Sequence, residues 1–163
     1  MLAKTLRDKK VLDLISTDPG VYRWYMPQSL VDQLNIPIEG CDYKNDYGYF
    51  VYVGIAKNMR QRLDWHISQK HSKSSVRSGF LSTLRQTLCG LARVPMDDEQ
   101  TVNTLIDQMS IEFIICSSKD DAESIEKEII HGSTLPLNIM HNKHPFVKEL
   151  KRLRGISKRL ESK

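Results

Sequence analysis

The sequence has no long hydrophobic run. Its unbroken apolar stretches are only a few residues long, whereas a helix needs roughly 20 consecutive apolar residues to cross a bilayer. The amino end also lacks the apolar block of a secretory signal peptide. We therefore expect a soluble cytoplasmic protein that has no membrane partner.

Cysteine is scarce as well. Cys41, Cys89 and Cys116 are odd in number, lie far apart and never form a C-x-x-C pair. This pattern argues against a disulfide framework and against a zinc knuckle. We expect buried or inert thiols in a reducing compartment.

The composition that remains is that of one modest domain. The chain has 163 residues, of which 40% are hydrophobic, and this is enough apolar material for one core. We expect a single domain over residues 1–163.

Positive charge is concentrated at the carboxyl end. Residues 145–163 contain seven Lys and Arg and two Glu, which gives this segment a net charge of +5. The whole chain has a net charge of +4, so the other residues together carry −1. The apolar residues of this segment recur at helical spacing and predict an amphipathic helix over 145–161, with Gly155 as a point where it could be interrupted. The helix would expose a basic face.

Two interpretations of this basic face remain open. It can be the solvated side of a packed helix, or it can contact the phosphates of a nucleic acid. A membrane-surface helix is disfavoured because its apolar face has no Trp and one Phe. The candidate phosphate contacts are Lys148, Lys151, Arg152, Lys158 and Arg159.

The rest of the chain alternates between short strand and helix patterns. Stretches rich in β-branched and aromatic residues predict strands at 21–25, 49–53 and 111–116. Apolar periodicity and capping residues predict helices at 4–16, from 58 to beyond 66, and at 76–91, 99–109 and 120–130. Residues 26–48 read as a long insert with one helical turn. The expected fold is mixed α/β, with a small three-stranded, mainly antiparallel sheet flanked by helices.

Two aromatic-glycine tripeptides begin the pattern that carries chemistry. They are Gly20-Val21-Tyr22 and Tyr52-Val53-Gly54. Alternation along a strand places Tyr22 on one face with Trp24, and Tyr52 on one face with Phe50. Any one tyrosine could be an ordinary sheet aromatic, but the glycine beside each lets backbone or ligand approach closely. If the strands pair antiparallel, both hydroxyls can line one cleft.

Arg62 and His66 follow on the next expected helix. They are four residues apart, which places them on one helical face with Cβ atoms about 5–6 Å apart. The same spacing would suit two exposed polar residues. A functional site needs more than this pair.

The ordered set of residues from Gly20 to Asn138 resembles the GIY-YIG nucleases. The resemblance rests on the two tripeptides, on the stretch from Lys57 to Arg62 that follows them, and on Glu126 followed by Asn138. It covers most of the chain. It implies a GIY-YIG-like fold, hydrolysis of phosphodiester bonds, and DNA, in double-stranded form, as the partner.

The resemblance also implies roles for the residues of the first half. Tyr22 would take the proton of the attacking water, and Tyr52 would help shape the phosphate site. Arg62 would neutralise phosphate charge, with Arg60 as its competitor in the sequence. His66 would relay or donate a proton, with His71 as a weaker candidate. Tyr52, His66 or Lys57 would assist Tyr22 in removing the proton of the water.

In the second half, the resemblance makes Glu126 the metal ligand and Glu128 the fallback. Mg²⁺ is the expected cofactor, with Mn²⁺ as a substitute, since Mg²⁺ keeps several waters and takes further ligands from phosphate. Asn138 would support the site by fixing backbone. His141 and His144 form a weak metal pattern that fits a polar loop better.

The chain departs from compact family members in its insert. Twenty-nine residues separate Tyr22 from Tyr52, which resembles the restriction endonucleases of the family. We expect a restriction-type nuclease, which would act as a dimer. The alternatives are a structure-selective repair or recombination nuclease and a non-catalytic nucleic-acid-binding module. A purely protein-binding domain has only the amphipathic tail in its favour.

Overall fold

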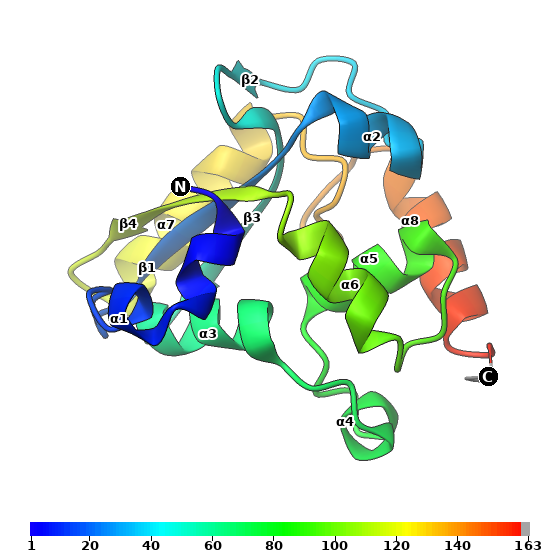
Figure 1. The fold of residues 1–163 in the computed structure, drawn as a ribbon. Coiled ribbons are helices and arrows are strands. Elements are labelled where there is room, and N and C mark those ends of the chain that lie inside the picture. Colours follow the sequence, from blue (N-terminus) through cyan, green and yellow to red (C-terminus); the bar gives the residue numbers. More distant parts are fainter. Residues whose placement is uncertain (161–163) are drawn as a thin grey trace.

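A computed structural model describes residues 1–160 of the chain, which Figure 1 shows as a ribbon. The strands are β1 (Gly20–Met26), β2 (Tyr43–Lys44), β3 (Gly48–Ala56) and β4 (Ser110–Ile115). The helices are the 3-10 segment η1 (Ala3–Arg7) and α1 (Lys9–Leu12), α2 (Gln28–Leu34), α3 (Met59–Ser68), α4 (Lys73–Arg77), α5 (Thr83–Ala92), α6 (Glu99–Ile106), α7 (Lys119–Gly132) and α8 (Phe146–Ser157). None of these helices is long and apolar enough to span a bilayer.

The strands form one antiparallel sheet in the order β2-β3-β1-β4. The expected mixed α/β class is confirmed, but the sheet has four strands where the sequence predicts three. The fourth strand, β2, has two residues, which pair with Tyr49 and Gly48 of β3. A pair of residues is too short to show alternation, so this strand had no detectable pattern within the insert.

A β-bulge changes which aromatic side chains share a face. Trp24 pairs with Tyr52 and Tyr25 pairs with Phe50, so β3 contributes one extra residue, Val51, between the two pairs. Tyr52 therefore packs with the Trp24 side of the sheet, whereas Phe50 packs with Tyr25 on the opposite side. The expectation that Tyr52 and Phe50 share a face is wrong, because the bulge interrupts the alternation.

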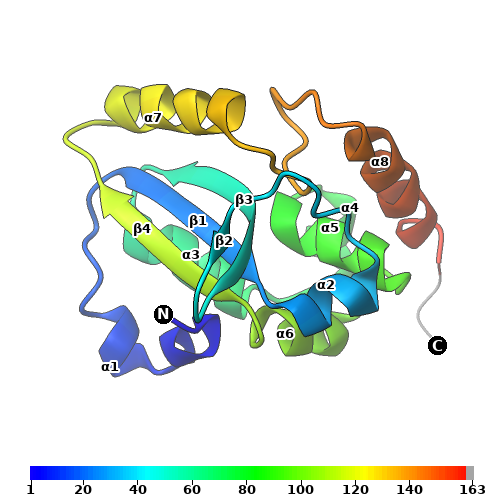
Figure 2. The ribbon, with the colours of Figure 1, turned by 90° about the horizontal axis from the view of Figure 1, so that it is seen from above.

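The sheet separates two layers of helices. Helix α7 covers one face, where Val21, Phe50 and Val53 meet Ala122 and Ile130. The larger core lies on the other face, under α3, α5 and α6 (Figure 2). Tyr22 and Tyr52 belong to this larger core.

Two expected helices are each divided. The pattern over 4–16 contains η1 and α1, because Asp8 adopts an extended conformation between them and its side chain accepts the Lys10 N–H at 2.9 Å. The pattern over 76–91 covers the end of α4 and most of α5, because Ser82 starts a new helix by accepting the Arg85 N–H at 3.2 Å. Local capping bonds override the apolar periodicity in both places.

The basic segment forms α8, which ends at Ser157 rather than at 161. Gly155 lies inside the helix and does not interrupt it. Position 161 lies outside the described residues. Leu150 and Leu153 are buried against α5, so α8 is a packed helix.

Candidate active site

The two tripeptides meet because β1 and β3 are antiparallel neighbours. Tyr22 lies opposite Gly54, and a Cβ at Gly54 would collide with the hydroxyl and ring of Tyr22. Glycine at this position is what lets the phenol ring cross the neighbouring strand. The rings of Tyr22 and Tyr52 lie with their centroids 6.5 Å apart.

His66 reaches Tyr22 from α3. Its Nε2 lies 2.9 Å from the Tyr22 hydroxyl, and its Nδ1 lies 3.2 Å from Ser82 Oγ. Burial, followed by the positive charges of Arg62 and Arg85, lowers the pKa of His66 to about 3. His66 is therefore a neutral imidazole that holds Tyr22 through one nitrogen and Ser82 through the other.

Burial also keeps both tyrosines neutral. It raises the pKa of Tyr22 well above 10, and the neighbouring Tyr52 adds to this effect while Arg62 opposes it. The pKa of Tyr52 rises to about 12, again chiefly by burial and then by the charge of Glu126. Free phenolate is therefore rare at neutral pH, and either hydroxyl must pass its proton to a partner.

Arg62, rather than Arg60, lies with the tyrosines. It is one turn before His66 on α3, and its charge lowers the pKa of both Tyr22 and Tyr52. Its guanidinium lies over the ring of Trp65, 5.2 Å from the centroid. Arg60 instead donates to the carbonyls of Ile15 and Asp13 at 2.8 and 2.7 Å, so it anchors the turn after α1.

The charge of Glu126, on α7, acts on the same tyrosines. Its negative charge raises the pKa of both tyrosines, and burial raises the pKa of its own carboxyl. Among residues 1–160 no hydrogen bond or ion pair engages this carboxylate. Glu128 is exposed on the outer side of the helix.

A half-buried carboxylate without a protein partner suits a hard divalent cation, which would supply the missing positive charge. Glu126 therefore fits the expected metal ligand. In the described part of the chain no cluster of three or more His, Cys, Asp or Glu side chains is placed to hold an ion. Most ligands of a cation at Glu126 would have to be water and substrate oxygens.

His141 and His144 have separate environments. The charge of His141 acts on Glu126 and lowers the pKa of that carboxyl. His144 Nδ1 instead accepts the Phe146 N–H at 3.1 Å at the start of α8. The two histidines therefore do not form a shared metal site.

Asn138 fixes the strand that carries the second tripeptide. Its Oδ1 accepts the Val53 N–H and its Nδ2 donates to the Val53 carbonyl, both at 2.9 Å. Leu137 N–H also donates to the Val51 carbonyl at 3.1 Å. The segment after α7 thus runs along β3, which holds the backbone on both sides of Tyr52.

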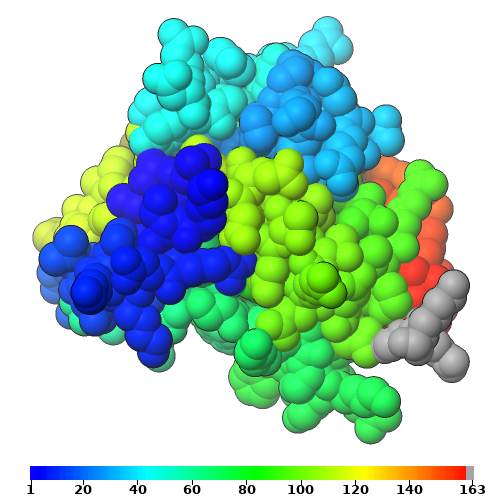
Figure 3. All heavy atoms as spheres, viewed as in Figure 1, coloured from blue at the N-terminus to red at the C-terminus, as the bar shows by residue number. Residues whose placement is uncertain are grey.

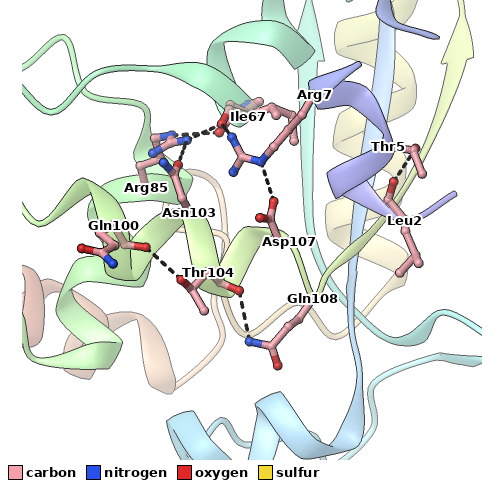
Figure 4. Close-up of polar contacts among 11 residues, drawn as sticks. Leu2, Thr5, Arg7, Ile67, Arg85, Gln100, Asn103, Thr104, Asp107 and Gln108 are labelled. Atoms are coloured by element: carbon pink, nitrogen blue, oxygen red, sulfur yellow. Dashed lines mark hydrogen bonds and ion pairs between the residues drawn. The ribbon is translucent and has the colours of Figure 1, made fainter. Parts of the chain in front are cut away.

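Arg85 contributes to the site in a way that the sequence did not indicate. This fully buried side chain on α5 donates to the carbonyls of His66 and Ile67, both at 2.8 Å. Arg7 donates to the same Ile67 carbonyl at 2.9 Å (Figure 4). The two arginines satisfy carbonyls at the end of α3, where the helix dipole favours positive charge. A basic residue in an amphipathic helix is usually exposed, so the pattern concealed this role.

His71 belongs to this support and not to the tyrosine cluster. Its Nδ1 lies 2.8 Å from the Met96 carbonyl, and its Nε2 lies 2.9 Å from Arg85 Nη1. The carbonyl requires a proton on Nδ1, so Nε2 accepts from Arg85. His66 is the histidine beside Tyr22.

Lys57 lines a groove of about 610 Å³ along α3. Arg62, Trp65 and Lys119 also line this groove. Arg62 is thus common to the groove and to the tyrosine cluster. Lys57 is exposed, and among residues 1–160 it forms no hydrogen bond with either tyrosine.

The predicted phosphate contacts, on α8 and directly after it, lie outside the cluster. Lys148, Lys151, Lys158 and Arg159 are exposed. Arg152 is exposed too, but it forms two hydrogen bonds with Glu149, at 2.7 and 2.6 Å. Its charge is therefore partly compensated within the helix.

A family model described as a GIY-YIG catalytic domain matches residues 20–156. The chain belongs to the GIY-YIG family. The matched span begins at the first tripeptide and includes the tyrosines, Arg62, His66, Glu126 and most of α8. GIY-YIG proteins are nucleases that act on DNA. A search of curated proteins and a search of solved structures found no match.

Proposed function

We propose that this GIY-YIG protein is a Mg²⁺-dependent endonuclease that hydrolyses duplex DNA. The observation that carries the proposal is the hydrogen bond between Tyr22 and His66. The charges of Arg62 and Glu126 also act on Tyr22. These groups cover the tasks of phosphodiester hydrolysis: proton removal, charge neutralisation and cation binding.

The proton path runs from water to Tyr22 and on to His66. When Nδ1–H donates to Ser82, Nε2 is free to accept the Tyr22 proton, so Tyr22 can receive one from water as it gives one up. A bound phosphate adds negative charge beside His66, which raises the pKa of the imidazole and makes it a better acceptor. Substrate binding would therefore activate this relay.

Arg62 would neutralise the charge that develops on the phosphate. A guanidinium stays cationic and can hold two oxygens at once. Tyr52, whose hydroxyl stays protonated, would donate a hydrogen bond to the same phosphate. These fixed groups act strongly because the surroundings of the tyrosines are largely dry.

Glu126 would hold Mg²⁺ or Mn²⁺. When bound, the ion would supply Lewis-acid stabilisation of the phosphate and would increase the acidity of a bound water. The half-buried carboxylate supports this role because it lacks a protein partner among residues 1–160.

Restriction-type action is the biological role that we favour. Besides the insert and α8, a basic segment over residues 69–82 offers a surface that a DNA duplex could contact. This segment contains α4, which projects at the edge of the molecule in Figures 1 and 3. Phe80 on this segment is 66% exposed. The Gln69 side chain forms hydrogen bonds with the Phe80 carbonyl and the Ser82 N–H, at 2.7 and 2.8 Å. The segment is therefore bonded to Ser82, the residue that contacts His66. A dimer would let two such sites cut both strands.

Cleavage of supercoiled plasmid tests the proposal. We expect nicked or linear DNA with Mg²⁺ or Mn²⁺ and none with EDTA. Glu126→Gln should abolish cleavage while duplex binding persists, because only cation binding is lost. Glu128→Gln, on the exposed side of the same helix, should cut normally. Loss of activity in Glu128→Gln alone would move the metal site to that residue.

The products separate the possible roles. A restriction-type enzyme should give discrete fragments from linear DNA of defined sequence, and gel filtration with DNA should show a dimer. Preferential cutting of branched substrates over linear duplex would favour a repair or recombination role. DNA binding without cleavage under any divalent cation would leave a non-catalytic module.

A further inference from the structure

Helix α8 has an inner face that joins the site. It packs against α5 so closely that a Cβ at Gly90 would lie 2.9 Å from the backbone nitrogen of Arg154. Ser157 Oγ donates to the Cys89 carbonyl at 3.0 Å one turn further on. Arg154 is therefore held at a fixed helix crossing, unlike the exposed cations of the outer face.

The side chain of Arg154 is oriented by Gln86. Arg154 Nη2 donates to Gln86 Oε1 at 2.6 Å, while Gln86 Nε2 donates to the Leu81 carbonyl at 2.6 Å. Gln86 lies one turn after Ser82, which bonds His66. Helix α5 thus holds His66 at its first turn and Arg154 at its second.

Arg154 is a half-buried cation without a carboxylate partner. Among residues 1–160, its one side-chain hydrogen bond is the bond to Gln86, whereas Arg152 pairs with Glu149 and Arg7 pairs with Asp107. Burial lowers the pKa of the Arg154 guanidinium. A desolvated cation gains from an anion that can use its remaining N–H donors.

The location of Arg154 differs from that of Arg62. Arg154 acts on Tyr52, whose pKa it lowers, while His66 responds to Arg62 and Arg85. Arg62 faces both tyrosines from α3. The two cations therefore lie on different helices, Arg62 on α3 and Arg154 on α8.

We propose that Arg154, oriented by Gln86, forms a second anion site that holds a DNA phosphate next to the one that Arg62 contacts. Arg62 serves the phosphate at the reacting atoms. Arg154 positions the strand by binding its neighbour, so it is a positioning residue. The identity of the anion as DNA phosphate rests on the proposed nuclease function.

Duplex binding without cleavage tests this site. Arg154→Gln should weaken binding in EDTA and flatten the dependence of log affinity on log salt by about 0.9, the value for one lost phosphate contact. In cleavage assays it should raise KM more than it lowers kcat. Arg152→Gln, on the exposed face of the same helix, is the matched control and should change the slope less. Equal slopes for Arg154→Gln and wild type, or a loss confined to kcat, would overturn the proposal.

A second measurement does not depend on nuclease activity. In the NMR spectrum, the Nε–H resonance of Arg154 is identified as the one that is missing from Arg154→Gln. This resonance should shift when inorganic phosphate is added to wild type or to Arg152→Gln. No shift in wild type would overturn the anion site. If this resonance shifts but the protein neither binds nor cuts DNA, the nuclease function is contradicted and the anion site is supported. If Arg154→Gln does not fold, Arg154→Lys should fold, and it should bind DNA more weakly than wild type because it lacks the guanidinium fork.

Discussion

The central groups of the site are neutral, and the charged groups surround them. Tyr22 and His66 are buried and hydrogen-bonded to each other, and burial shifts the pKa of each toward its uncharged form. Arg62, Glu126 and Arg154 keep partial exposure. Because burial penalises charge, this arrangement leaves the charged groups where phosphates and a cation can reach them.

Replacing Tyr22 by Phe should remove cleavage without unfolding the protein. The change deletes one hydroxyl and its bond to His66, and it keeps the ring that packs across Gly54. We expect a melting temperature within a few degrees of wild type and no product in a plasmid assay. Undiminished cleavage would reduce Tyr22 to a sheet aromatic.

Replacing Arg62 by Ala should lower kcat by roughly 10²–10³-fold, the loss typical of one removed transition-state donor. Single-turnover assays at saturating enzyme measure this step directly. Arg62→Lys keeps the charge but loses the planar fork, so it should recover part of the rate. A defect in DNA affinity with normal single-turnover rate would contradict the role of Arg62 in the reaction.

Among the elements, α5 connects the parts of the site. It carries Ser82, Arg85 and Gln86, whose bonds reach α3 and α8. Ser82 is the N-cap and the other two residues follow within about one turn, so one end of α5 positions both His66 and Arg154. The start of α5 at Ser82 is therefore a functional boundary as well as a cap.

The exposed cations of α8 and of the residues directly after it should determine the salt dependence of DNA binding. We expect the combined change of Lys148, Lys151, Lys158 and Arg159 to Gln to flatten the log-affinity versus log-salt slope by about 2 to 4 for duplex DNA. Preference for particular sequences should persist, because phosphate contacts do not read bases. Fluorescence anisotropy over a salt series measures the slope, with Arg152→Gln as the control. An unchanged slope would leave α8 with a merely solvated outer face.

At the scale of the whole molecule, the site lies where both layers meet β3. The core under α3 and α5 holds the tyrosines, and α7 lies on the opposite face of the sheet. The segment that follows α7 bonds along β3 at Val51 and Val53. Through this segment the chain returns from α7 to the strand that carries Tyr52.

Stability should fall in acid partly because His66 is buried. Its pKa is about 3 in the folded protein against 6.5 for the free group, so the unfolded chain binds the proton first. The contribution of His66 is therefore complete above about pH 6.5 and is lost as pH falls toward 3. His66→Gln should show a smaller drop in melting temperature between pH 7 and pH 5 than wild type. His131→Gln, at an exposed site, should behave as wild type; equal drops in all three proteins would contradict this assignment.

The sequence by itself determined the ordered motif, the fold class and most element positions. These features depend on local patterns: alternation in the strands, apolar periodicity in the helices, and caps such as Asn58, whose side chain accepts the Gln61 N–H at 3.0 Å. The family match over residues 20–156 confirms the resemblance that the motif suggested. Short-range chemistry was sufficient for this level of description.

Only the tertiary structure decided which polar residues share the site. Arg60 and Arg62 look alike in sequence, yet one bonds the turn after α1 and the other faces the tyrosines. The bulge at Val51 and the support from Arg85 and Arg154 were likewise invisible. Each depends on contacts between segments that are far apart in the chain. Those contacts are set by helix crossings and strand register, which no local sequence pattern encodes.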